Sequence, residues 1–321
     1  MQEVISHRAP IPPAQSSHLT TMAKKTGKKW KKVVKPSDKT LKGKKDDIII
    51  PIMGSTGAGK STFINTYLGE ERARTSDSLN SCTPEVKDYH HTLPSKRRVV
   101  LVDTPGFNDT HEDEAEILRR VSVWLASAYE AEMKVAGVIY LHDVSQKRMY
   151  GSTRLNLTMF QNLCGPNFFS KVVMATTHWD GINFNAGVER EAELRQNYWS
   201  PILSQGGTIR RIVSRPKDVR EAVNHIVAQH IRNESRSSPG VDALALQHEL
   251  VELDKSIPMT QAGKRLKGTL REIMESLKEG LAHESDPRRQ EELRRQMTLL
   301  QSQVRELNIP FGERLKSWFG L

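Results

Sequence analysis

Gly54-Ser55-Thr56-Gly57-Ala58-Gly59-Lys60-Ser61 is the stretch that decides the fold of this chain. It fits the pattern G-x-x-x-x-G-K-S/T and follows residues 48–53, an apolar run that predicts a buried strand. Glycine lets backbone N–H groups turn inward around phosphates, and a helix that begins after the loop directs the positive end of its dipole at the same anion. The stretch therefore predicts a phosphate-binding loop. Lys60 would bridge the outer phosphates, Ser61 would place its hydroxyl on Mg²⁺, and Thr62 would extend the nucleotide contact.

A second apolar strand is predicted at residues 98–102, and it ends in Asp103-Thr104-Pro105-Gly106, a signature typical of GTPases. Asp103, at the carboxyl end of the strand, would hold the water shell of Mg²⁺. The Gly106 N–H would bond the terminal phosphate only when that phosphate is present. A nucleotide switch needs such a contact.

The polar segment 72–85 between these motifs has no apolar periodicity, which suits a mobile first switch. We assign Thr83 as the Mg²⁺-contacting threonine because it lies midway between Ser61 and Asp103. Thr83 and Lys60 are accordingly the candidate catalytic residues. An ordinary loop threonine, whose hydroxyl serves a local hydrogen bond, is the alternative for Thr83.

A third motif indicates which base is bound. Residues 171–177 read as a strand that runs into Thr177-His178-Trp179-Asp180, where GTPases carry Asn/Thr-Lys-x-Asp. The Asp180 carboxylate can accept from both N1–H and the exocyclic amine of guanine, a donor pair that adenine lacks. His178 stands where a lysine is usual, and a structural histidine is its alternative. Residues 209–214 read as a last strand, whose Ser214 would contact the guanine or simply end the strand.

Taken together, these residues resemble the septin-like branch of the TRAFAC P-loop GTPases, which includes septins, immunity-associated GTPases and plastid envelope import GTPases. Within that branch, the chain resembles uncharacterised fungal G-domain proteins and the immunity-associated GTPases. The resemblance covers residues 48–234 and rests on Gly54 to Ser61, Ser81-Cys82-Thr83, Asp103 to Gly106, Tyr140-Leu141-His142, Leu163-Cys164-Gly165 and Thr177 to Asp180.

The resemblance implies GTP and GDP as ligands, Mg²⁺ as cofactor, slow hydrolysis of GTP to GDP and a homodimer formed through the switch face. Phe107 follows Gly106 where small GTPases carry a water-orienting glutamine, so the domain alone should be a poor catalyst. A GTP-binding assembly scaffold with negligible hydrolysis, acting through its helical extension, is therefore the alternative function.

The positive charge is concentrated at the N terminus. The net charge is +10 over 321 residues, and residues 1–47 account for +8 of it. Because the excess is confined to that segment, we expect no specific nucleic-acid surface. Residues 1–47 hold Trp30 and few other large apolar groups, which predicts a disordered basic tail. The tail would serve either solubility or, alternatively, targeting or contact with an anionic surface.

Cysteine content and hydropathy bear on the compartment. Two cysteines, Cys82 and Cys164, allow no disulfide framework or C-x-x-C metal site, and no apolar run reaches the roughly 18 residues of a membrane span. The N terminus lacks a signal-peptide apolar core. We expect an intracellular, cytoplasmic protein, with a peripheral membrane contact and nuclear targeting by the tail left open.

The predicted fold is α/β: a three-layer, doubly wound, mostly parallel sheet of the P-loop NTPase type with a C-terminal helical extension. His142, after the strand 135–141, reads as a solvated strand-end histidine or as a contact to nucleotide or partner. The G domain would span 48–234, and 235–240 would be a linker. Residues 241–321 would form a helical hairpin leaning on the G domain, or a coiled coil with a partner. An amphipathic C-terminus would carry Phe311, Leu315 and Trp318.

Overall fold

The computed structural model describes residues 28–38, 43–73, 85–106, 114–149, 151–213, 216–234 and 243–307. Several sequence-based predictions therefore lie outside the described residues. They concern Thr83 and most of the first switch, Phe107, Ser214, the linker 235–240, the first 27 residues of the basic tail and the C-terminal segment after residue 307.

A six-stranded sheet forms the centre of the domain, in the order β2-β3-β1-β4-β5-β6. Five strands are parallel: β1 (Ile48–Gly54), β3 (Arg98–Asp103), β4 (Val138–Asp143), β5 (Val172–Thr177) and β6 (Thr208–Arg211). The edge strand β2 (Lys87–Thr92) pairs antiparallel with β3. The mostly parallel sheet is confirmed. The sequence pattern did not reveal β2, because its polar residues carry no strand periodicity and it forms by pairing with β3.

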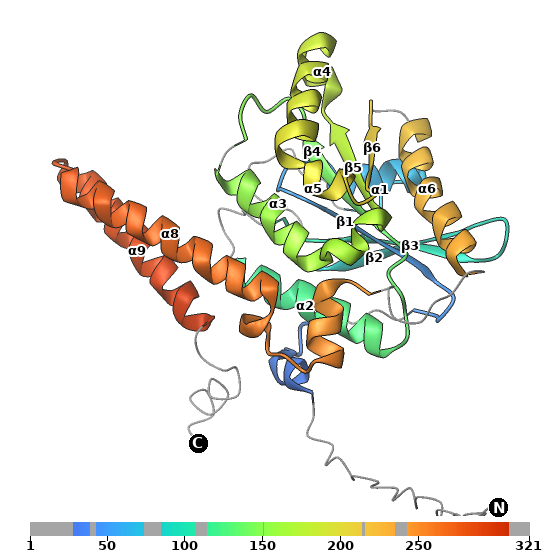
Figure 1. Cartoon of the computed structure of the whole chain (residues 1–321), viewed down its shortest axis with the longest axis horizontal. Helices are drawn as coiled ribbons and strands as arrows, with labels where there is room; N and C mark the ends of the chain where they lie inside the picture. Colours follow the sequence, from blue (N-terminus) through green and yellow to red (C-terminus); the bar gives the residue numbers. More distant parts are fainter. Residues whose placement is uncertain are drawn as a thin grey trace, which may run out of the picture.

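Helices cover both faces of the sheet, as Figure 1 shows. On one face, α1 (Lys60–Leu68) and α6 (Pro216–Glu234) pack on Ile48, Ile50 and Ile52 of β1. On the other face, Ile49 and Met53 contact the core that α2 (Glu114–Glu130) and α3 (Gly151–Cys164) complete. Alternate side chains of a strand point to opposite faces, so this uninterrupted apolar strand is buried on both sides.

Smaller elements close the second face. They are the 3₁₀ helix η2 (Pro166–Lys171), the 3₁₀ turn η3 (Trp179–Gly181), α4 (Phe184–Glu193), the π-helix η4 (Leu194–Tyr198) and α5 (Ser200–Leu203). Trp199 and Ile202 from this region are fully buried in the same core. Apart from η2, which precedes β5, these elements follow the carboxyl end of β5, the edge at which open α/β sheets place their ligands.

The C-terminal part is helical, as predicted. It comprises α7 (Ala245–Gln247), the π-helix η5 (His248–Glu252), the 3₁₀ turn η6 (Ile257–Met259), α8 (Gln261–His283) and α9 (Pro287–Glu306). Leu266 and Leu270, in the first half of α8, are fully buried in the core that α2 and α3 share. The far half of α8 and its partner α9 project away from the sheet as a hairpin (Figure 1).

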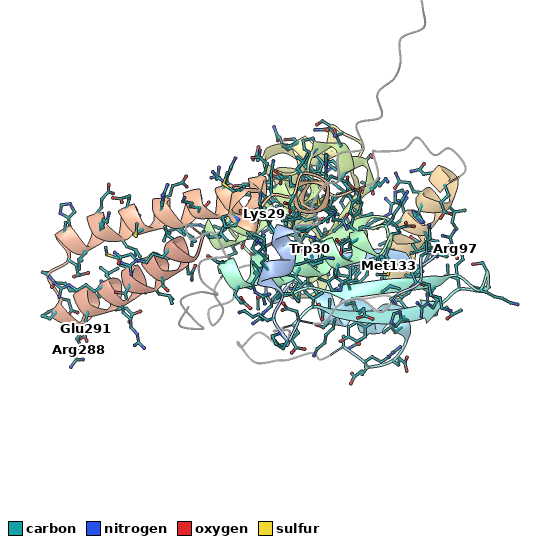
Figure 2. All side chains as sticks on the ribbon, turned by 90° about the horizontal axis from the view of Figure 1, so that it is seen from below. Lys29, Trp30, Arg97, Met133, Arg288 and Glu291 are labelled. Atoms are coloured by element: carbon teal, nitrogen blue, oxygen red, sulfur yellow. The ribbon has the colours of Figure 1, made fainter. Side chains whose placement is uncertain are left out.

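The described part of residues 1–47 is folded, so the prediction that this whole segment is disordered is wrong for residues 28–38 and 43–47. The 3₁₀ turn η1 (Lys29–Val33) packs against α2 and η5, with Trp30 only 4% exposed. Figure 2 shows Lys29 and Trp30 on this turn. Lys28 Nζ donates to Val251 O at 2.8 Å. The composition of residues 1–47 did not predict this packing, because Trp30 and Val33 are buried against a surface that α2 and the C-terminal extension supply.

None of the helices within the described residues combines the length and apolar character required to cross a bilayer.

Candidate nucleotide-binding site

The predicted phosphate loop joins β1 to α1, and its glycines take conformations that other residues rarely adopt. Gly54 has a φ of 141°, and a Cβ there would lie 2.4 Å from Leu141 O on the neighbouring strand. Gly59 has a φ of 87° and caps the start of α1. A side chain at Gly54 would clash with backbone, so the close approach of β1 and β4 at this point requires glycine. The local sequence pattern therefore folds as its motif predicts.

Lys60 is buried in this loop. Its Nζ donates to Gly54 O at 3.1 Å and to Ser55 O at 3.0 Å, so the ammonium lies over the loop backbone. The buried hydroxyls of Ser55 and Thr56 have no hydrogen-bond partner among the described residues. A buried polar group without a partner is costly, and a bound anion with hydrogen-bonding oxygens would relieve that cost.

Ser61 and Asp103 meet at the carboxyl edge of the sheet. The Ser61 hydroxyl donates to Asp103 Oδ2 at 2.8 Å, and Asp103 is 1% exposed. A hydroxyl and a carboxylate oxygen suit Mg²⁺, which in nucleotide sites binds one or two protein oxygens besides phosphates and waters. The two residues therefore fit the ion. No group of three or more His, Cys, Asp or Glu side chains that could hold a metal occurs among the described residues.

Gly106 passes directly against the phosphate loop. A Cβ at this position would lie 2.5 Å from Thr56 N and 2.7 Å from Thr56 Oγ1, so only glycine fits. Thr104, two residues earlier, donates its hydroxyl to Ile52 O at 2.8 Å and fixes the segment to β1. The structure thus brings the second motif against the first.

The third motif is tied to the phosphate loop by Thr177. Its hydroxyl donates to Ala58 O at 3.0 Å, with His142 O at 3.1 Å. His178 has a left-handed backbone (φ 57°), and its ring atom Cε1 lies 3.5 Å from where a Gly59 Cβ would be. The Nδ1 atom of His178 is 3.7 Å from Asp143 Oδ1. Asp180 follows on the exposed side of the 3₁₀ turn Trp179–Gly181, where a ligand can reach it.

Two side-chain pairings behind this turn were not foreseen from the sequence. Trp179 is buried, and its Nε1 donates to Thr176 at both the carbonyl oxygen (3.2 Å) and the hydroxyl (3.1 Å). Glu191 of α4 pairs with Arg211 of β6 beside the same ring. No signal in the sequence links these residues, because α4 and β6 meet only in the folded domain.

His142 is not the solvated strand-end histidine that the sequence favoured. It is 5% exposed and packs edge-on against Trp199, with ring centroids 6.0 Å apart. Burial lowers the pKa of His142 to about 4. Its side chain lines a cavity of about 250 Å³, together with residues that include Lys147, Arg148, Arg190, Leu194 and Tyr198. His142 is therefore a neutral core residue at neutral pH.

Comparison with known proteins agrees with this geometry. Residues 49–163 match the family described as 50S ribosome-binding GTPase. GTP-binding protein A of Dictyostelium discoideum is 23% identical over 142 residues, covering 44% of this chain and 30% of that protein. Neuronal-specific septin-3 of Mus musculus is 25% identical over 122 residues, covering 36% of this chain and 33% of that protein. The chain thus spans about a third of the length of these relatives.

Among solved structures, a dimerization-deficient mutant of Toc33 from Arabidopsis thaliana superposes with a TM-score of 0.50 at 12% identity. The alignment covers 62% of this chain and 87% of that one, and at this identity it supports the fold alone. The narrower resemblance to fungal and immunity-associated proteins stays a prediction.

Proposed function

The G domain of this chain belongs to the septin-like P-loop GTPases, and from that premise we propose that it binds GTP and GDP with Mg²⁺ and hydrolyses GTP slowly. The observation that carries the proposal is the convergence of three motifs on one loop. Asp103 contacts Ser61, Gly106 abuts Thr56, and Thr177 bonds Ala58. The meeting of three motifs far apart in sequence at this one loop supports a nucleotide site there.

Each residue then has a defined task. Lys60 exchanges its carbonyl contacts for the outer phosphates, and the loop N–H groups hold the phosphate oxygens. Ser61, Asp103 and Thr83 would hold Mg²⁺, which would neutralise charge on the phosphates when bound. The Gly106 N–H contacts the terminal phosphate, and Asp180 accepts from the guanine edge. The imidazole of His178 takes the place of the usual lysine stem beside the base.

Titration calorimetry with GTP, GDP and ATP, each with and without Mg²⁺, tests the binding. We expect GTP and GDP to bind and ATP not to bind. In Asp180→Asn the donor and acceptor pattern is reversed, so guanine nucleotides should bind more weakly and xanthine nucleotides more tightly. Equal affinities for GTP and ATP would exclude the proposal.

Lys60→Ala separates ligand binding from folding. Because the Lys60 ammonium faces the loop and not the apolar core, the variant should lose nucleotide affinity yet keep a cooperative melting transition. If Lys60→Ala loses its melting transition together with binding, the lysine is structural and its assignment to the phosphates is wrong.

Hydrolysis is proposed to need a second copy of the chain. With Phe107 in place of a water-orienting glutamine, the site has charges for the transition state but lacks that glutamine to position water. A two-fold contact through the switch face would supply missing groups in trans. Specific activity should then rise with protein concentration over a dilution series, and light scattering should show a dimer with a non-hydrolysable GTP analogue. Flat activity from a persistent monomer would favour the scaffold function without turnover.

A further inference from the structure

We infer that Glu191 and Arg211 are positioning residues for guanine recognition, because their ion pair holds the Trp179 ring and thereby fixes the turn that carries Asp180. The inference rests on the proposed function and extends it to residues that touch no nucleotide.

The ion pair is bidentate and joins two elements that are distant in sequence. Glu191, at 2% exposure, lies near the end of α4, and Arg211 ends β6. Arg211 Nε donates to Glu191 Oε2 at 2.9 Å, and Arg211 Nη2 donates to Glu191 Oε1 at 3.0 Å. Two parallel bonds fix the plane of the guanidinium as well as its distance, which a single contact or a lysine could not do.

A chain of hydrogen bonds leads from this pair to the tryptophan. Glu191 Oε2 also accepts from the Thr176 hydroxyl at 3.2 Å. The same hydroxyl accepts from Trp179 Nε1 at 3.1 Å, and the Thr176 carbonyl accepts from it at 3.2 Å. Each donor in this buried chain has its acceptor, so the network rigidifies the structure around it.

The Trp179 ring is held by packing as well. The Arg211 guanidinium lies 5.1 Å from its centroid, within the range of a cation–π contact. Phe184 packs on it with ring centroids 5.5 Å apart. Gly187 supplies the remaining wall, since a Cβ there would lie 2.6 Å from the ring. The ring is therefore packed in a single position between β6 and α4.

Trp179 directly precedes Asp180 in a turn of three residues, and His178 before it has a constrained left-handed backbone. A shift of the tryptophan must therefore move the carboxylate that reads the base. Hydrogen bonds weaken steeply as their distance and angle depart from the optimum. Loss of the Glu191–Arg211 pair should consequently weaken recognition of the guanine amine while leaving the phosphate loop, anchored separately by β1 and α1, intact.

Inosine diphosphate provides the readout, because its base keeps N1–H but lacks the exocyclic amine. The GDP-to-IDP affinity ratio measures the second bond that Asp180 accepts. We expect Glu191→Gln and Arg211→Gln to lower this ratio by about tenfold, a change of about 1.4 kcal/mol, with IDP affinity changed much less than GDP affinity. The Arg211 side chain is 38% exposed, so Arg211→Gln should fold even if Glu191→Gln does not.

Arg97→Gln is the matched control. Arg97 forms a bidentate pair with Glu234 at 2.7 and 2.8 Å, and it precedes β3 at the edge of the sheet opposite the site. Figure 2 shows Arg97 at the end of the domain away from the hairpin tip, where Arg288 and Glu291 lie. This control should keep the wild-type GDP-to-IDP ratio, whatever its melting temperature.

The outcomes separate the two proposals. If the wild-type protein binds neither GDP nor IDP, the proposed function fails. If the wild-type protein prefers GDP and folded Arg211→Gln keeps that preference, the positioning role is overturned and the pair is structural only. A lowered ratio in Arg211→Gln with an unchanged ratio in Arg97→Gln supports the positioning role, since a loss of stability alone would not distinguish the two bases.

Discussion

Replacing Arg119 with methionine should lower the free energy of unfolding by about 3–5 kcal/mol, because it would leave two carboxylates without their main partner. Arg119 lies on α2 and is 2% exposed. Its guanidinium donates to Asp38 at 2.6 and 2.8 Å, to Glu116 at 2.7 and 2.8 Å, and to Val33 O at 2.9 Å. The residue thus joins the N-terminal segment to α2, the first helix after the motif that ends at Gly106.

The pH dependence follows from Glu116. Burial by itself would raise the pKa of Glu116, but hydrogen bonds from Arg119 and Lys35 lower it to about 2, from an ordinary value near 4.5. A carboxyl with a lowered folded-state pKa contributes its stability above the unfolded pKa and loses it as the pH falls toward the folded pKa. The cost of Arg119→Met should therefore be full above pH 5 and shrink between about pH 4.5 and pH 2.

Urea unfolding at pH 7 and at pH 3, followed by circular dichroism, measures this. With a denaturant slope of about 2 kcal/mol per molar, the variant midpoint should fall by roughly 2 M at pH 7. Arg97→Met is the control: it breaks an equally bidentate pair whose members are 24% and 46% exposed, and it should cost about 0–1 kcal/mol. A urea midpoint of Arg119→Met that is no lower than that of Arg97→Met would refute the claim that burial makes the Arg119 ion pairs contribute more to stability than an exposed pair.

Three further outcomes are expected. Deleting residues 1–38 should destabilise the domain by more than about 3 kcal/mol, since it removes buried Trp30 and the Asp38 partner of Arg119, and a melting temperature equal to wild type would contradict this. Gly106→Ala should abolish any difference between the GTP and GDP affinities in a nucleotide-binding assay, because its Cβ would lie 2.5 Å from Thr56 N. Gly268→Ala, where no atom lies within 4 Å of the added Cβ, should bind both nucleotides as the wild type does. Burial lowers the pKa of His142 to about 4, so the unfolded state binds more protons than the folded state between pH 6.5 and pH 4. The free energy of unfolding should therefore decrease as the pH is lowered from 6.5 to 4, by an amount on the order of 3 kcal/mol. His142→Phe should flatten that part of a pH titration of the melting temperature, and an unchanged slope would show that His142 is not the titrating group.

The sequence by itself determined the phosphate loop, the second motif and the third motif, which ends in Asp180. Each is a short run at the end of a strand, and its conformation depends on local features: glycine at left-handed positions, a helix start, and a carboxylate at a strand end. The parallel sheet followed from the same information, because apolar runs alternate with helical patterns. Thr83 and Ser214 were assigned by position alone and stay predictions.

Only the tertiary structure decided which side chains support those motifs. Trp30 stands in a segment that was expected to be disordered, and it proved to be core. His142 was expected at a solvated strand end or against a ligand or partner, and it proved to be buried against Trp199. Glu191 and Arg211 carried no motif, yet they meet beside Trp179. Burial and pairing of this kind depend on surfaces that distant elements contribute. The residues next to a side chain along the sequence therefore do not predict its burial or its partner.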